Sequence, residues 1–333
     1  MEMTAQELRS VQFHSLDQNG QWSDAFRLWL GTKAANTRRS YETAWQELLK
    51  FTGKMPWEIS SVDVERFVAS LRDDYAPSTV QQRLAAISSF YSFTQTNYMI
   101  YQDGKEQPLY HYNPAKTVRR PRVQPYGKAN PLDHDQARAL LGAIDRGTVQ
   151  GKRDYALLLA YVATGRRNSE IRVLQWGQIE SSGHRTWYHW QGKANSYGKY
   201  ELPGVVFQAM VDYLSAAGRL DGMTAGSYIF TALTDHANRL PGVQHDPERP
   251  LSARYVRDLV KKYARLAGLD PEKLRVHDLR HTAAILRQDA GDGIGDICSF
   301  LGHKSPETTV RYLHQVGGRP DRSWTSVADK LGL

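Results

Sequence analysis

The sequence predicts a mainly α-helical protein with a small β-sheet, divided into two domains. Its 333 residues are enough to form two hydrophobic cores. Most of the chain shows helical periodicity of apolar residues. For example, Val80, Leu84 and Ile87 recur at the spacing of one helix face. Strand-like residues concentrate at 186–190 and 199–202, on either side of a glycine-containing turn. Helices therefore supply most of the expected fold, and one hairpin supplies the sheet.

The N-terminal part predicts a flexible arm followed by a helical domain. Residues 1–20 are polar and lack periodicity. Ser60 and Pro77 stand where helices commonly begin. We expect the domain to cover residues 21–112, with an extra loop or hairpin at 97–112. The four helical patterns within it occupy residues 24–30, 37–51, 62–71 and 77–93.

Residues 113–130 predict a basic interdomain linker. Prolines disfavour regular structure in this segment, and cations without intervening acids favour an extended path along phosphates. The cations that we expect to contact phosphates here are Lys116, Arg119, Arg120 and Arg122.

Residues 131–333 predict a second, mostly helical domain with the small sheet. We expect Lys193 near the tip of the hairpin, and a surface insertion at 234–250. A helix over 154–164 should end at Gly165, and Asn168 or Ser169 should cap another helix that runs through Leu174. Arg167 then lies at a rigid break between the two helices.

The segment that begins at His277 predicts a helix with two different faces. At about 100° per residue, one face should pack and the other should face a phosphate. The expected polar face comprises His277, Arg280, His281, Ala284 and Gln288. The expected packing face comprises Leu279, Thr282, Ala283 and Leu286.

Composition favours a polyanionic partner and the cytoplasm. The net charge is +8 and the pI is about 9.4, with the excess spread along the chain. Ordinary solubility charge explains the same number, so charge alone does not decide. The single cysteine, Cys298, excludes an internal disulfide framework and should be a buried structural thiol. Without an apolar leader or a long apolar stretch, we expect a soluble cytoplasmic protein with no membrane partner.

The residues that can carry chemistry concentrate in the C-terminal half. A phosphodiester is anionic, and its pentacoordinate transition state concentrates more charge on the non-bridging oxygens, which guanidinium groups suit. Lysine and histidine can move protons, and a tyrosine can attack phosphorus. Such a set can break DNA covalently with no metal and no nucleotide cofactor. In chain order it comprises Arg167, Lys193, His277, Arg280, His303 and Tyr312.

Four short boxes connect these residues to a known family. They read ATGRRNSEI at 163–171, HDLRHT at 277–282, LGH at 301–303 and TVRYLH at 309–314, with nine positions from His303 to Tyr312. In this order and spacing they resemble the tyrosine recombinases, the family of phage integrases, Xer-type recombinases and Cre-like enzymes. The likeness covers roughly residues 20–315.

The resemblance implies a role for each box. Arg167 matches the family's first arginine because only it has the family's spacing to the supporting residue Glu170. Arg166 departs from the pattern, since an apolar residue is usual at its position. Tyr312 matches the nucleophile, and Lys193 is the candidate general acid for the departing 5′-oxygen. His277 and the arginines can help to deprotonate the phenol.

The resemblance also implies a fold and an assembly. It implies a SAM-like core-binding domain and an α+β catalytic domain that close on DNA as a C-shaped clamp. Protomers would form a tetramer, bind inverted-repeat half-sites, and exchange strands through 3′-phosphotyrosyl intermediates and a Holliday junction. A tail helix with Trp324, Val327 and Leu331 would pack on a neighbouring protomer. Further DNA contacts in the first domain would come from Lys33, Arg38, Arg39 and Arg83.

Two other functions compete with this interpretation. A type IB topoisomerase uses similar chemistry as a monomer, although residues 37–41 and 77–83 resemble a recombinase core-binding domain. A catalytically silent DNA-binding or architectural factor could share the fold. The target site, the nick spacing, any accessory protein and the biological outcome do not follow from the sequence.

Overall fold

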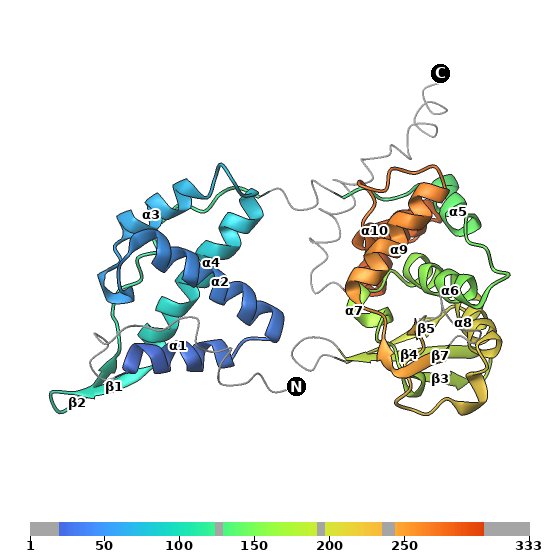
Figure 1. The fold of residues 1–333 in the computed structure, drawn as a ribbon, viewed down its shortest axis with the longest axis horizontal. Coiled ribbons are helices and arrows are strands. Elements are labelled where there is room, and N and C mark those ends of the chain that lie inside the picture. Colours follow the sequence, from blue (N-terminus) through green and yellow to red (C-terminus); the bar gives the residue numbers. More distant parts are fainter. Residues whose placement is uncertain (1–19, 124–128, 192–196, 235–243, 303–333) are drawn as a thin grey trace, which may run out of the picture. The chain divides into compact units, whose positions relative to one another are not determined.

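The chain folds into two units, which a computed structural model describes over residues 20–123, 129–191, 197–234 and 244–302 (Figure 1). One unit comprises Met1–Gln124 and the other Pro125–Leu333. Each has its own cluster of buried hydrophobic residues. Every helix within the described ranges is too short or too polar to cross a membrane.

The described residues of the N-terminal unit contain the four α-helices that the sequence predicted. Ser60 caps the third helix: its hydroxyl accepts a hydrogen bond from the Asp63 N–H, and the Asp63 carboxylate accepts one from the Ser60 N–H. Pro77 lies in the first turn of the fourth helix, where a missing N–H costs nothing. The helices are α1 (Gln21–Gly31), α2 (Ala35–Thr52), α3 (Ser61–Ser70) and α4 (Pro77–Thr96).

Phe90 lies at the centre of the aromatic core of this unit. Its ring centroid is 5.0 Å from that of Trp45 and 5.2 Å from those of Phe26 and Trp29. The rings of Phe26 and Trp45 meet it edge to face, which is a favoured aromatic geometry. All four side chains are buried, so one ring joins α4 to both α1 and α2.

Truncation of Phe90 should therefore destabilise this unit strongly. We expect Phe90→Ala to lower the free energy of unfolding by about 3–5 kcal/mol, because it removes a buried ring and leaves a cavity. Phe51→Ala is the matched control, since Phe51 is 48% exposed, and it should cost no more than about 1 kcal/mol. Urea unfolding of both variants measures the difference, and equal losses would show that Phe90 is not central.

A β-hairpin follows α4, which confirms the hairpin expected at 97–112. Strands β1 (Met99–Gln102) and β2 (Lys105–Pro108) pair antiparallel. Asp103 and Gly104 form the turn, with φ of 52° and 77°. An Asp-Gly pair suits such a turn because both positions need positive φ.

The first residues of the segment predicted as a linker pack against the N-terminal unit. Ala115 and Val118 are buried in the core of the N-terminal unit. The Asn113 side-chain amide donates a hydrogen bond to the carbonyl of Ser88 on α4. This start differs from the extended path expected from Asn113 onward, because Ala115 and Val118 bury apolar surface against the helices.

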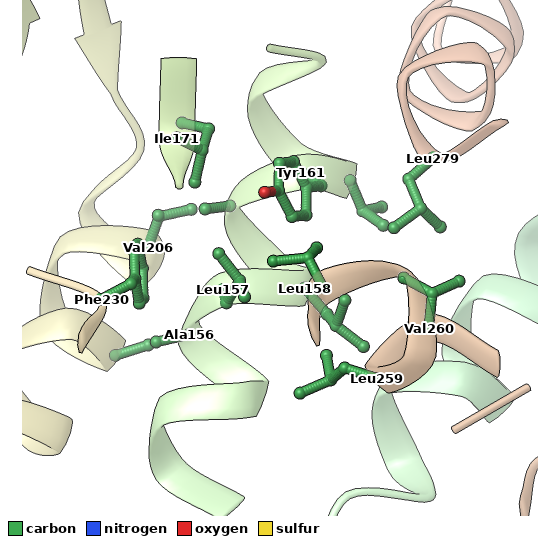
Figure 2. Packing of buried hydrophobic residues seen from close by; sticks show 14 of the residues in the cluster. Ala156, Leu157, Leu158, Tyr161, Ile171, Val206, Phe230, Leu259, Val260 and Leu279 are labelled. Carbon is green, nitrogen blue, oxygen red and sulfur yellow. The ribbon is translucent and has the colours of Figure 1, made fainter. Parts of the chain in front are cut away.

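Helix α6 (Val149–Thr164) is the centre of the C-terminal unit. Figure 2 shows its Leu157 and Tyr161 among side chains that include Val206, Val260 and Leu279. Each large side chain buried in this way contributes about 1.5–3 kcal/mol. The surrounding helices are α5 (His134–Gly142), α7 (Asn168–Ile171), α8 (Gly204–Ala216), α9 (Ala253–Leu266), α10 (Val276–Asp289) and α11 (Ile294–Leu301).

A three-stranded antiparallel sheet contains the predicted hairpin. Its strands are β3 (Ile179–Ser182), β4 (Arg185–Gln191) and β5 (Tyr197–Leu202), in the order β3-β4-β5. Tyr188 of β4 pairs with Tyr200 of β5. The hairpin prediction is confirmed, and the sheet gains a polar first strand that the sequence pattern did not indicate.

The prediction of a single small sheet in this unit is wrong. A second, two-stranded sheet pairs β6 (Thr231–Thr234) with β7 (Gln244–Pro250), and β7 lies within the segment predicted as a surface insertion. The sequence of β7, QHDPERP, is polar and contains two prolines. It therefore has neither the alternation nor the composition by which a strand is recognised.

Candidate active site

The break between α6 and α7 requires a glycine at position 165. Gly165 ends α6 in the left-handed conformation, with φ of 60°, and its N–H donates to the Tyr161 carbonyl. A Cβ at this position would lie 2.8 Å from the Phe300 ring and 3.2 Å from the Ala283 Cβ. Both the backbone conformation and the close packing exclude larger residues, so the break is fixed in place.

Arg167 occupies the N-cap position of α7. The Glu170 carboxylate accepts a hydrogen bond from the Arg167 N–H at 3.1 Å and one from its guanidinium at 2.8 Å. The prediction of Asn168 or Ser169 as the cap of a helix through Leu174 is wrong, because α7 spans Asn168–Ile171 and Glu170 satisfies the N–H of the residue before it. Glu170 thus holds Arg167 through both its backbone and its side chain.

The two adjacent arginines have different environments. The side chain of Arg167 is 45% exposed and faces solvent beside Glu170. Arg166 is only 2% exposed and lies inside the unit. Of the pair, Arg167 is therefore the one that can reach a ligand from solution, in keeping with its assignment from the sequence.

Arg280 joins three of the predicted boxes. It lies on α10 and is 4% exposed. Its Nη1 donates to the Gly165 carbonyl and its Nη2 to the Leu301 carbonyl, both at 2.6 Å. These carbonyls lie at the ends of α6 and α11, where backbone acceptors lack partners within the helix. One side chain thus connects α10 to the segments just before Arg167 and His303.

The predicted division of α10 into a packing face and a phosphate-facing face is wrong over most of its length. Arg280, His281 and Ala284 were assigned to the polar face, and all three are buried. Leu279 and Thr282 on the opposite side are buried as well. The helix is covered on both sides because its arginine meets two helix ends, so His277 is the member of the expected polar face that remains exposed.

His277 and His281 form a neutral pair of imidazoles. Their ring centroids lie 4.7 Å apart, edge to face. Desolvation lowers the pKa of His277 below its usual value even though the side chain retains an exposed edge, and the charge of Arg280 adds to the effect. Burial first, and then His277, lower the pKa of His281 to about 3. At neutral pH both rings are uncharged, and His277 can accept a proton.

Three predicted catalytic residues lie outside the described residues: Lys193, His303 and Tyr312. The described chain reaches close to the first two. Strands β4 and β5 lead into and out of the segment that carries Lys193, and α11 ends immediately before Gly302 and His303. Their catalytic roles stay predictions.

The residues predicted to contact DNA differ in the solvent exposure of their side chains. The Arg83 guanidinium is 12% exposed, pairs with Glu47 and lies 4.1 Å from the Tyr75 ring centroid, so it has a structural role in the N-terminal unit. Arg38 is half-buried and donates to the Leu30 carbonyl. Lys33 is half-buried over the Trp29 ring. The exposed members are Arg39, Lys116, Arg119, Arg120 and Arg122.

Helix α9 carries exposed cations that were not predicted from the sequence. Arg254 and Arg257 have side chains that are 84% and 60% exposed, and both lie near Asp258. Their three-residue spacing, which places both side chains on neighbouring positions of one helix face, was the sequence pattern that could have indicated them.

Within the described ranges, no group of three or more His, Cys, Asp or Glu side chains is arranged to hold a metal.

Comparison with known proteins places this chain in a family. The model of the phage integrase family matches residues 130–317, and that of the phage integrase N-terminal SAM-like domain matches residues 21–98. The chain belongs to the phage integrase family of tyrosine recombinases. It is an enzyme of that family, with a SAM-like N-terminal domain and a C-terminal catalytic domain, as the resemblance implied.

Individual relatives agree with this assignment. Tyrosine recombinase XerC of Chlamydia trachomatis serovar L2 is 30% identical over 244 residues, which cover 73% of this chain and 69% of that protein. The XerC of Herpetosiphon aurantiacus is 28% identical over 293 residues, which cover 85% and 86%.

Solved structures share the fold. XerH site-specific recombinase bound to palindromic difH substrate superimposes with a TM-score of 0.68 at 17% identity, covering 95% of this chain and 86% of that one. A lambda integrase dimer bound to a COC′ core site gives a TM-score of 0.63 at 15% identity, covering 90% and 97%.

The low pKa of His281 should make stability depend on pH. The unfolded chain binds a proton at this histidine near pH 6.5, whereas the folded chain binds it near pH 3. As pH falls below 6.5 the unfolded state takes up more protons, so the free energy of unfolding falls. Between about pH 7.5 and pH 5 we expect this histidine to account for a loss of about 2 kcal/mol.

Urea unfolding of wild type and His281→Gln at several pH values measures this contribution. The substitution is expected to reduce the pH dependence of stability, whatever it does to stability at neutral pH. Identical pH dependence in the two proteins would contradict the low pKa of His281.

Proposed function

We propose that the protein is a site-specific recombinase that cleaves and rejoins duplex DNA through a 3′-phosphotyrosyl intermediate at Tyr312. The contact that carries this proposal is that of Arg280 with the carbonyls of Gly165 and Leu301. It supports a single site, because it brings His277 and the helix break before Arg167 to the end of α11, where His303 follows. The proposal adds Tyr312, which follows His303 by nine positions in the sequence, to the same site.

The proposed reaction needs only the chain's own groups. The Tyr312 oxygen attacks phosphorus, a bond from phosphorus to tyrosine forms, and the bond to the 5′-oxygen breaks. Tyrosine has a pKa near 10, so the phenol loses its proton as it attacks, and neutral His277 accepts it. Lys193 donates a proton to the departing 5′-oxygen. Arg167 and Arg280 stabilise the charge that grows on the non-bridging oxygens.

Strand exchange then reverses the same step. The free 5′-hydroxyl of a second strand attacks the phosphotyrosine, restores the phosphodiester and releases the tyrosine. The phosphotyrosyl bond conserves the energy of the broken linkage, so the proposal requires no ATP and no metal. Two such rounds pass through a Holliday junction.

We further propose that the protein acts as a tetramer in the cytoplasm, at the nucleoid. Its substrate is duplex DNA with inverted-repeat half-sites. The palindromic substrate in the XerH structure supports this, since an inverted repeat presents equal half-sites to two protomers. The tail helix with Trp324, Val327 and Leu331 would join neighbouring protomers, and the exposed linker cations Lys116 and Arg119 would contact phosphates.

Tyr312→Phe tests the nucleophile directly. We expect the variant to bind its DNA site with an affinity within about twofold of wild type, because the ring is kept, and to form no covalent adduct, because the attacking oxygen is gone. A gel-shift titration measures the affinity, and a nicked substrate that traps the adduct, followed by peptide mapping, measures the covalent attachment. An adduct on another residue of the variant would remove Tyr312 from the mechanism.

The adduct assay on wild type tests the silent factor, and assays of supercoil relaxation and of strand joining between two sites test the topoisomerase. A silent DNA-binding factor forms no adduct even as wild type. A type IB topoisomerase forms the adduct but relaxes supercoiled DNA as a monomer and joins no strands between two sites.

A further inference from the structure

Arg166 is a buried arginine outside the set of proposed catalytic residues. It follows Gly165 at the break between α6 and α7 and is 2% exposed. The resemblance predicts an apolar residue here, and burial of a guanidinium in its place carries a desolvation cost. Its contacts indicate what offsets that cost.

Stacking holds the Arg166 guanidinium in place. Its Cζ lies 3.8 Å from the centroid of the Tyr200 ring and 5.6 Å from that of Phe300. Nε donates to the Thr164 carbonyl at 3.2 Å. Nη1 and Nη2 are buried and have no hydrogen-bond partner in the part of the chain that the structure describes. The faces of the two aromatic rings therefore stabilise the charge of Arg166. No carboxylate among the described residues pairs with it.

The two rings belong to segments that lead to different catalytic residues. Tyr200 lies on β5, opposite Tyr188 of β4, in the hairpin that carries Lys193. Phe300 is in the last turn of α11, just before His303. A Cβ added to Gly302 would lie 3.0 Å from the Tyr200 hydroxyl and 3.6 Å from the Arg166 Nη1. The strand, the guanidinium and the end of α11 thus meet at one point.

We infer that Arg166 is a positioning residue that holds the β4–β5 hairpin against the end of α11 and thereby places Lys193 for its proton transfer. The inference rests on the proposed function, in which Lys193 protonates the 5′-oxygen. A planar guanidinium suits this role because it stacks on aromatic faces, whereas an aliphatic side chain offers no charge to the Tyr200 ring.

A change of leaving group isolates the step that Arg166 should affect. A 5′-bridging sulfur departs without protonation, so it makes the general acid dispensable. On the natural 5′-oxygen substrate, Arg166→Met should slow single-turnover cleavage by about tenfold to a hundredfold, a part of what a general acid contributes. On the sulfur substrate its rate should return to within about threefold of wild type, while DNA affinity stays within about twofold on both.

Lys193→Ala provides the reference for this pattern. It should lose more on the oxygen substrate and recover in the same way on sulfur. The double variant Arg166→Met/Lys193→Ala should be no slower than Lys193→Ala alone, because the second change has no proton donor left to misplace.

Two further variants test the contact itself. Arg287→Met is the matched control: the Arg287 guanidinium lies 3.8 Å from the same Phe300 ring, but it pairs with Asp292, so its loss should leave cleavage at the wild-type rate. Tyr200→Leu removes the ring from the side of the strand and should repeat the substrate pattern of Arg166→Met. It also tests the inference if Arg166→Met does not fold.

Three results would overturn the inference: equal loss on the oxygen and sulfur substrates, no loss on either, or an equal defect in Arg287→Met. Each of them leaves the proposed function standing as long as wild type forms its adduct on Tyr312. Absence of that adduct in wild type would instead refute the proposed function.

Discussion

The candidate site depends on one buried guanidinium. Arg280 donates to the carbonyls of Gly165 and Leu301, which end two helices far apart in the sequence. Helix-end carbonyls need partners, and a buried arginine needs acceptors, so each offsets the desolvation of the other. A hydrogen bond to a charged group contributes about 1.5–3 kcal/mol. The same side chain can then serve the architecture and, in the proposed reaction, the charge on phosphate.

The three arginines of the candidate site differ in burial and in what holds their side chains. Arg167 is held by Glu170 at the surface, where a ligand can reach it. Arg280 is buried and bonded to backbone, and Arg166 is buried and stacked on the Tyr200 ring. Neutral His277 remains exposed on α10, and desolvation together with the charge of Arg280 keeps its pKa low. The electrostatics and the packing of the site therefore follow from the same contacts.

The sequence predicted the parts of the fold that local patterns encode. The helices follow from apolar spacing and from caps such as Ser60, and the hairpins follow from Gly104 and from the aromatic strand that contains Tyr188. Strand β7 was not predicted, because its polar sequence becomes a strand only through pairing with β6. The burial of Arg280 and the stacking of Arg166 could not be predicted from the sequence either, because they depend on where α11 and β5 lie in space. The catalytic roles of all six residues stay predictions: Arg167, Lys193, His277, Arg280, His303 and Tyr312.

Native-state hydrogen exchange of Arg280→Lys tests most directly whether this guanidinium holds the boxes together. A lysine keeps the charge but cannot donate to both carbonyls in the same geometry. We expect faster exchange at the amides of residues 165–171 and 298–302 together, with no change in α2 of the N-terminal unit. Unchanged exchange at both segments would contradict the account, because it would mean that other contacts hold the ends of α6 and α11 beside α10.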